Sequence, residues 1–123
     1  MFANGETTFS THLPDQWQTV NLSLAVRRNV LLIAMESLHN AARHAHAENV
    51  TLEMERGERG HWIMRVIDDG FGLKDGNGNG LGLGMQSIKL RANEIGAEID
   101  WTQNNGRGTI VTLKFNPQAK ERR

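Results

Sequence analysis

The longest hydrophobic pattern in the chain has the period of an α-helix. Between residues 26 and 45, apolar side chains recur every three or four positions: Val26, Val30, Ile33, Ala34, Leu38, Ala41 and Ala45. Either Asn21 or Ser23 can cap the start of this helix. A second run of the same period ends at Gly96, a residue suited to stopping a helix: Leu81, Met85, Ile88, Ala92 and Ile95. The pattern predicts two amphipathic helices.

Other segments alternate between apolar and polar residues, as half-buried strands do. They lie around residues 50–54, 62–66, 99–101 and 111–115, with turn residues at 56–60 and 104–106. A short strand is also predicted at 9–13, ended by Pro14. This order of elements predicts an α+β fold: a two-layer α/β sandwich whose mixed, mostly antiparallel sheet is covered on one face by helices.

Composition narrows the class of protein. With 123 residues the chain is large enough for one domain, with a core at about 6–116 and a charged tail at 117–123. Fourteen basic residues balance fourteen acidic ones, so no overall field favours nucleic acid or a membrane surface. There is no cysteine, which excludes disulfides and thiolate chemistry. We therefore expect neither nucleic-acid binding nor direct membrane contact.

The first predicted helix carries a polar stripe. Glu36, Asn40 and His44 are four residues apart and so share a helix face, with Arg43 at its edge. On most helices such a stripe is a solvated surface with pairs between neighbouring turns. A carboxylate, an amide oxygen and cations in a row also suit a metal-bound polyphosphate.

A predicted strand runs directly into Asp68-Asp69-Gly70-Phe71-Gly72. A carboxylate at a strand end, followed by two spaced glycines, can accept a hydrogen bond from a flat ligand that lies close to the backbone. The exocyclic amino group of a purine is such a donor. A simple Asp-Gly turn is the alternative interpretation.

Glycines continue up to the second helix. Residues 73–79 are almost free of apolar side chains and read as a mobile lid. Gly80-Leu81-Gly82-Leu83-Gly84-Met85 would bring backbone amides to phosphate at a helix start. No βαβ unit follows, and no Gly-Lys-Ser/Thr occurs, so neither a Rossmann site nor a P-loop is predicted. Gly106-Arg107-Gly108-Thr109 alone would be a hairpin bend.

Taken in order and spacing, these four segments resemble the N box and the three glycine boxes of the GHKL ATPase superfamily. That group contains gyrase, heat-shock chaperone, mismatch-repair and histidine-kinase ATP-binding domains. The short lid, the Asp-Asp-Gly segment and Met85-x-x-Ile88-x-x-Arg91-Ala92 resemble sensor histidine kinases of the nitrate-sensor and DesK-like subgroup. The resemblance covers about residues 9–115.

The resemblance implies a catalytic role for Glu36 and Asn40. Asn40 would give an oxygen ligand to Mg²⁺, while Glu36 would either hold the metal shell or activate water. Arg43 and His44 would lie against the phosphates.

For the base, the resemblance implies that Asp68 accepts the adenine amino hydrogen and that Thr109 completes this contact through water. Glycines and their neighbours would supply the rest of the nucleotide site: Gly70, Gly72, Gly80, Leu81, Gly82, Leu83, Gly84, Met85 and Gly108.

The implied activity is that of the catalytic part of a two-component sensor kinase. It would bind Mg-ATP and donate the γ-phosphoryl group to a histidine on a separate dimerisation domain, and through it serve a response regulator. No histidine here is followed by an acidic residue, so we expect the acceptor domain to be absent and the chain not to phosphorylate itself. A cytoplasmic domain is expected, of a parent protein that can be membrane-anchored. An anti-sigma-factor serine kinase and a non-catalytic nucleotide-binding module are the alternatives.

Overall fold

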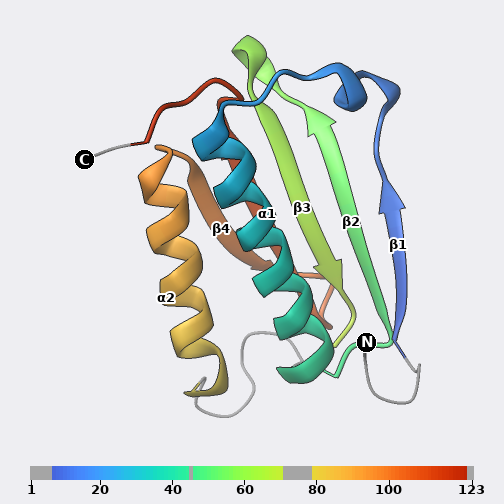
Figure 1. Ribbon diagram of the computed structural model, residues 1–123. Coiled ribbons are helices and arrows are strands. Elements are labelled where there is room, and N and C mark those ends of the chain that lie inside the picture. Colours follow the sequence, from blue (N-terminus) through green and yellow to red (C-terminus); the bar gives the residue numbers. More distant parts are fainter. Residues whose placement is uncertain (1–6, 45, 71–78, 122–123) are drawn as a thin grey trace.

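The computed structural model describes residues 7–44, 46–70 and 79–121; for His44 and residues 79–83 it describes the backbone alone. The chain forms five strands and two long helices within these ranges (Figure 1). In chain order the elements are β1 (Thr8–His12), α1 (Leu24–His39), β2 (Asn49–Arg56), β3 (Trp62–Asp68), α2 (Asn79–Glu94), β4 (Glu98–Gln103) and β5 (Thr109–Phe115). This is the order that the hydrophobic pattern predicts.

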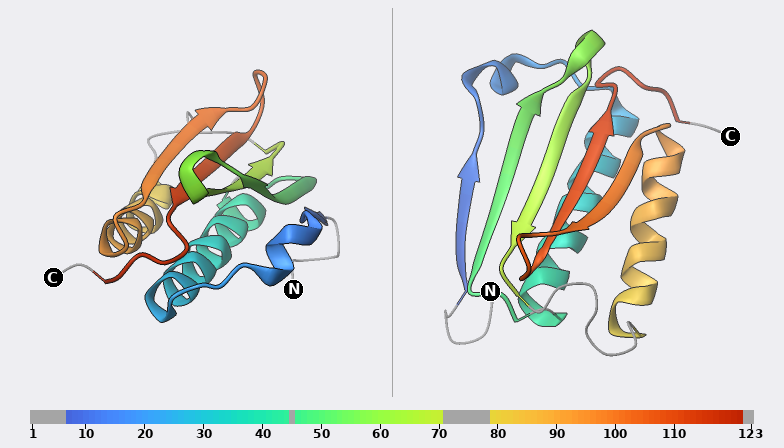
Figure 2. Two further views of the ribbon diagram at one scale, coloured as in Figure 1. Left: turned by 90° about the horizontal axis from the view of Figure 1, so that it is seen from above. Right: turned by 180° about the vertical axis from the view of Figure 1, so that it is seen from behind.

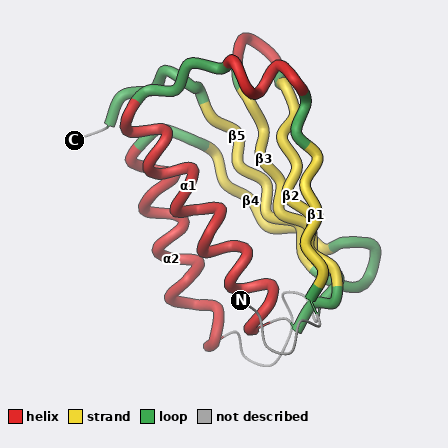
Figure 3. Tube along the Cα trace, turned by 45° about the vertical axis from the view of Figure 1, so that its right-hand side comes forward, coloured by secondary structure: helices red, strands yellow, loops and turns green. Residues whose placement is uncertain are grey.

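The strands form one sheet in the order β1-β2-β3-β5-β4. Only β1 and β2 are parallel, and every other neighbouring pair is antiparallel. Both helices lie on the same face of the sheet, as Figure 3 shows edge-on. The predicted two-layer α/β sandwich with a mixed, mostly antiparallel sheet is therefore confirmed.

Burial alternates along the central strands because one face of each is covered by helices. In β3 and β5 every second residue is buried and its neighbours are partly exposed. Val26, Ile33, Ile88 and Leu113 are 0% exposed and form the centre of the core between the helices and the sheet. The apolar stripe of each predicted helix is thus its sheet-facing side.

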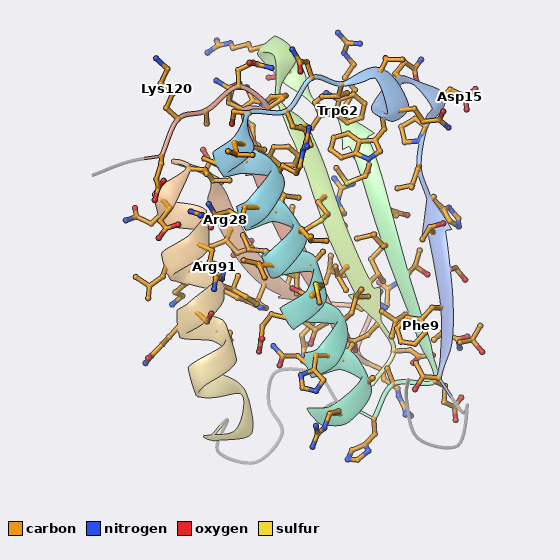
Figure 4. All side chains as sticks on the ribbon, viewed as in Figure 1. Phe9, Asp15, Arg28, Trp62, Arg91 and Lys120 are labelled. Carbon is orange, nitrogen blue, oxygen red and sulfur yellow. The ribbon has the colours of Figure 1, made fainter. Side chains whose placement is uncertain are left out.

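Aromatic residues close the end of the core that Figure 4 marks with Trp62. Trp62 is 4% exposed, and the Trp17 ring meets it edge-on, with centroids 5.2 Å apart. Trp17 comes from a short 3-10 helix (Asp15–Thr19) that the sequence pattern did not predict. Trp17 therefore packs against Trp62 and Phe115 at this end of the core.

The first helix differs from the prediction at its end. Ser23 caps the start, accepting the N–H of Val26 through its side chain at 3.2 Å. The α-helix ends at His39, and Asn40–His44 form one π-helical turn. The expected α-helix through residue 45 is therefore wrong in its last turn. A π-turn holds more residues than an α-turn, so the even four-residue stripe from Glu36 to His44 does not persist.

The second helix ends as predicted. Gly96 has a φ of +64°, and the N–H of Ala97 donates to the carbonyl of Ala92. Within the described residues, neither helix is long and apolar enough to cross a membrane.

Candidate nucleotide site

The predicted site residues gather at one end of the sandwich. The end of α1, the end of β3, the start of α2 and the β4–β5 turn all lie at the lower end of Figure 1, and the view from behind in Figure 2 agrees. A small buried cluster beneath them joins the helix layer to the sheet: Ala41, Ala47, Val50, Val66 and Val111. Asn40 is the residue before Ala41 of this cluster, and Asp68 lies two residues beyond Val66 on the same face of β3.

Asp68 is a buried carboxylate with a defined orientation. It is 6% exposed, and its Oδ1 accepts the N–H of Gly70 at 2.9 Å and the N–H of Thr109 at 3.2 Å. Both donors reach the same oxygen of the carboxylate, Oδ1. Strands β3 and β5 are adjacent, which is why residues 41 positions apart meet here.

Burial raises the pKa of Asp68 above its ordinary value, because the charged form loses water. The two N–H donors act in the opposite direction, and the neighbouring Asp69 adds a further increase. Asp68 is thus a carboxylate kept in a poorly solvated position between the end of β3 and the start of β5.

Gly108 is required beside Asp68. Its φ is +93°, and a β-carbon at this position would lie 1.9 Å from the carbonyl oxygen of Asp68. No larger residue fits against backbone at that distance. The Gly-x-Gly-Thr segment is therefore more than a hairpin bend: it lets β5 begin directly against the end of β3.

The other half of the site lies between the two helices. A β-carbon on Gly84 would be 2.8 Å from Oε2 of Glu36, and 3.1 Å and 3.2 Å from the amide nitrogen and oxygen of Asn40. Both of these side chains are partly buried, and Gly84 is buried. The structure therefore brings together an N-box acid, an N-box amide and a glycine of the third segment.

These side chains fit a Mg²⁺ ion that is shared with substrate. The described residues contain no group of three or more His, Cys, Asp or Glu that could enclose a metal. Mg²⁺ typically takes one or two protein oxygens and completes its shell with water and phosphate. Asn40 Oδ1 and the Glu36 carboxylate are the oxygens that could hold it.

The remaining predicted residues are placed less fully. Arg43 is exposed, and its guanidinium lies 3.3 Å from Nε2 of His39. Met85 is partly buried on α2. Gly80, Leu81, Gly82 and Leu83 belong to the first turns of α2, and His44 to the π-turn, by their backbone. Gly72 and most of the predicted lid lie outside the described residues.

Three contacts near Asp68 were not predicted from the sequence. The side chains of Asn104 and Arg107 donate to the carbonyl oxygens of Asp68 and Asp69, and the Asp69 carboxylate accepts bonds from the start of β2. The pairing of β5 with β3 is the feature from which these contacts could have been predicted. Once β5 is beside β3, the turn that precedes β5 must lie beside the residues that follow β3.

Comparison with known proteins gives the family. Residues 25–119 match the family described as histidine kinase-, DNA gyrase B-, and HSP90-like ATPase. The chain is 24% identical over 118 residues to the nitrate/nitrite sensor protein NarQ of Escherichia coli, covering 96% of this chain and 20% of NarQ. It is 32% identical over 98 residues to the sensor histidine kinase LiaS of Bacillus subtilis, covering 79% of this chain and 27% of LiaS.

Among solved structures, the blue-light activated histidine kinase EL346 of Erythrobacter litoralis has the same fold. Its TM-score is 0.73 at 24% identity, over 93% of this chain and 36% of that one. The chain thus spans between a fifth and about a quarter of the length of the curated relatives it matches. The resemblance drawn from the four boxes is confirmed: the chain belongs to the histidine kinase-, gyrase B- and HSP90-like family of ATP-binding domains, as a domain of the sensor histidine kinase type.

Proposed function

We propose that this domain binds Mg-ATP across the two halves of the site and donates the γ-phosphoryl group to a histidine on a separate dimerisation domain. The observation that carries the proposal is Asp68, a buried carboxylate held by two backbone donors on one oxygen. A carboxylate in this state accepts but does not donate. It therefore favours a base with an amino group at that position, adenine, over guanine, which has a carbonyl there.

The helix side of the site would bind the phosphates. Asn40 and Glu36 would hold Mg²⁺, which when bound neutralises phosphate charge and orients the triphosphate. Gly84 supports this role because a side chain at this position would collide with the Glu36 carboxylate and the Asn40 amide. Arg43 carries a positive charge on the same π-turn and would compensate phosphate charge.

The acceptor histidine would come from another domain. The five histidines of the chain are each followed by a neutral residue, Leu, Asn, Ala, Ala or Trp. A phosphoacceptor histidine is helped by an acid that follows it and removes its proton, and no acid follows a histidine in this sequence. The phosphorylated partner domain would then pass the group to a response regulator.

Two measurements test the proposal. In calorimetric titrations, we expect Mg-ATP to bind, Mg-GTP not to bind, and EDTA to weaken ATP binding. With γ-labelled ATP and a phosphoacceptor domain of a sensor histidine kinase, we expect acid-labile label on that domain and none on this chain. Acid-stable label on a serine would instead indicate an anti-sigma-factor type of kinase. Binding of ATP without transfer to any acceptor domain would indicate a non-catalytic nucleotide module.

A further inference from the structure

The end of β3 is fastened to the start of β2 by the side chain of Asp69. Its Oδ1 accepts the backbone N–H groups of Glu48 at 2.8 Å and of Asn49 at 2.9 Å. Its Oδ2 accepts the side-chain amide of Asn49 at 2.9 Å. Partial burial opposes ionisation, but these bonds outweigh it and lower the pKa of Asp69 below its ordinary value. The Asp69 carboxylate is therefore a charged anchor between the end of β3 and the start of β2.

On the side away from β2, the β4–β5 turn holds the backbone of Asp68 and Asp69. Nδ2 of Asn104 donates to the carbonyl of Asp68 at 3.0 Å, and Nε of Arg107 donates to the carbonyl of Asp69 at 2.6 Å. The turn itself is closed by backbone bonds from Asn104 to Gly108 and from Arg107 to Asn104. The backbone at residues 68 and 69 thus has side-chain donors on one side and a side-chain anchor on the other.

This arrangement sets the direction of the Asp68 carboxylate. The Thr109 N–H that bonds Oδ1 follows the turn by one residue, beyond Gly108. If the turn moved outward, that N–H would leave Oδ1, which would keep the Gly70 N–H, and the carboxylate could turn about this remaining bond. A hydrogen bond weakens steeply once its angle departs from linear. A small shift of the turn would therefore change the direction in which Oδ2 points.

We infer that Asp69, Asn104 and Arg107 form a clamp that positions Asp68 to read the amino group of adenine. These are positioning residues: each acts through the backbone on either side of the base-reading carboxylate. The inference rests on the proposed function, since it assigns the clamp to the same site and makes it a determinant of base selectivity.

The test separates the contribution of the base to binding from that of the phosphates. Purine riboside triphosphate has the ring and phosphates of ATP but lacks the 6-amino group. The ratio of its Kd to the Kd of ATP therefore measures the contact with Asp68 alone. For the unaltered chain we expect a ratio of about tenfold or more, because a hydrogen bond to a charged group is at stake.

The decisive variant is Asn104→Asp, which replaces a donor by an acceptor of nearly equal size facing the Asp68 carbonyl. We expect the Kd ratio to fall to about threefold or less, while purine riboside triphosphate binds within about twofold of the unaltered chain. Gln103→Glu, one residue earlier and exposed on β4, makes the same charge change and should leave the ratio unaltered. Arg107→Ala should lower the ratio as well, and Arg107→Lys, which keeps a donor, should restore most of it.

Three results would contradict either the clamp or the recognition of the base. If Asn104→Asp keeps the full Kd ratio, the clamp is wrong and the proposed function stands. If both nucleotides lose affinity by the same factor, the turn has only a structural role, and the positioning inference is again wrong. If the unaltered chain already shows a ratio near one, Asp68 does not read the amino group, and the base-recognition part of the proposed function fails instead.

Discussion

Replacing Asp68 by Asn should weaken nucleotide binding without weakening the fold. The new Oδ1 can still accept the N–H groups of Gly70 and Thr109, so the contacts between β3 and β5 are kept. The other carboxylate oxygen, Oδ2, is replaced by an NH2 group, which is a donor and would face the amino donor of adenine. The perturbation therefore acts on the ligand contact and leaves the internal hydrogen bonds in place.

In a thermal-shift assay, the Asp68→Asn substitution should reduce the stabilisation of the chain by ATP. ATP at 100 times its Kd stabilises a protein by about 2.7 kcal/mol. With about 2.1 cal/mol/K of unfolding entropy per residue, a chain of 123 residues gains about 4 °C per kcal/mol, or about 10 °C in total. Loss of a charged hydrogen bond, about 1.5–3 kcal/mol, raises Kd by roughly 10- to 150-fold. At the same ATP concentration the shift then falls to about 1–5 °C.

Without ATP, the expected change has the opposite sign. Burial raises the pKa of Asp68, so its charged form destabilises the fold at neutral pH, and this cost is lost as pH falls through the folded-state pKa. Asn carries no charge, so the unliganded Asp68→Asn variant should melt at or above the unaltered chain. Asp100→Asn, exposed on β4, removes the same charge and should leave the ATP shift at its full value. An Asp68→Asn variant with the full ATP shift would refute the assignment of Asp68 to the base.

Three further predictions concern neighbouring residues. Gly84→Ala should raise or preserve the melting temperature, since Ala favours helix by about 1 kcal/mol. It should also lower ATP affinity about tenfold or more, because the new methyl displaces Glu36 and Asn40. Titration calorimetry measures the affinity, with a thermal melt as the control, and an unchanged affinity would contradict the prediction. Gly108→Ala should lower the melting temperature by about 8 °C or more, because an L-residue at positive φ against backbone costs at least about 2 kcal/mol; a thermal melt within about 2 °C of the unaltered chain would be the contrary result. The preference for ATP over purine riboside triphosphate should decline on acidification at a higher pH than an ordinary carboxyl would give, because burial raises the pKa of Asp68; titrations at several pH values measure it, and a flat ratio would argue against it.

Much of the fold follows from hydrophobic period alone. The α-helical spacing before residue 39 and the alternation in β2, β3 and β5 each reflect burial on one side of an element, and the structure buries those sides. The π-turn at residues 40–44 could not be predicted in this way. A single turn of five residues is too short for hydrophobic period to separate an α-turn from a π-turn, and the choice between them depends on packing.

The two halves of the site differ in how far sequence spacing alone predicts them. Glu36 and Asn40 are close in sequence, so helical spacing alone put them together. Asp68 and Thr109 are 41 residues apart, and only strand pairing makes them neighbours. Here the resemblance to a family supplied what period could not. The contacts of Asn104 and Arg107 were missed because they involve backbone carbonyls, to which many polar side chains can donate.

In the proposed site, the end of α1 with the start of α2 binds one end of a nucleotide, and the end of β3 with the start of β5 binds the other end. Amide NMR spectra recorded with adenosine, Mg-triphosphate and Mg-ATP can follow the two halves separately. We expect adenosine to shift the signals of Gly70 and Thr109, Mg-triphosphate to shift those of Asn40 and Gly84, and Mg-ATP to shift both sets with one shared Kd. If Mg-ATP perturbs only one set, or the two sets titrate with different Kd values, the two halves do not form a single nucleotide site.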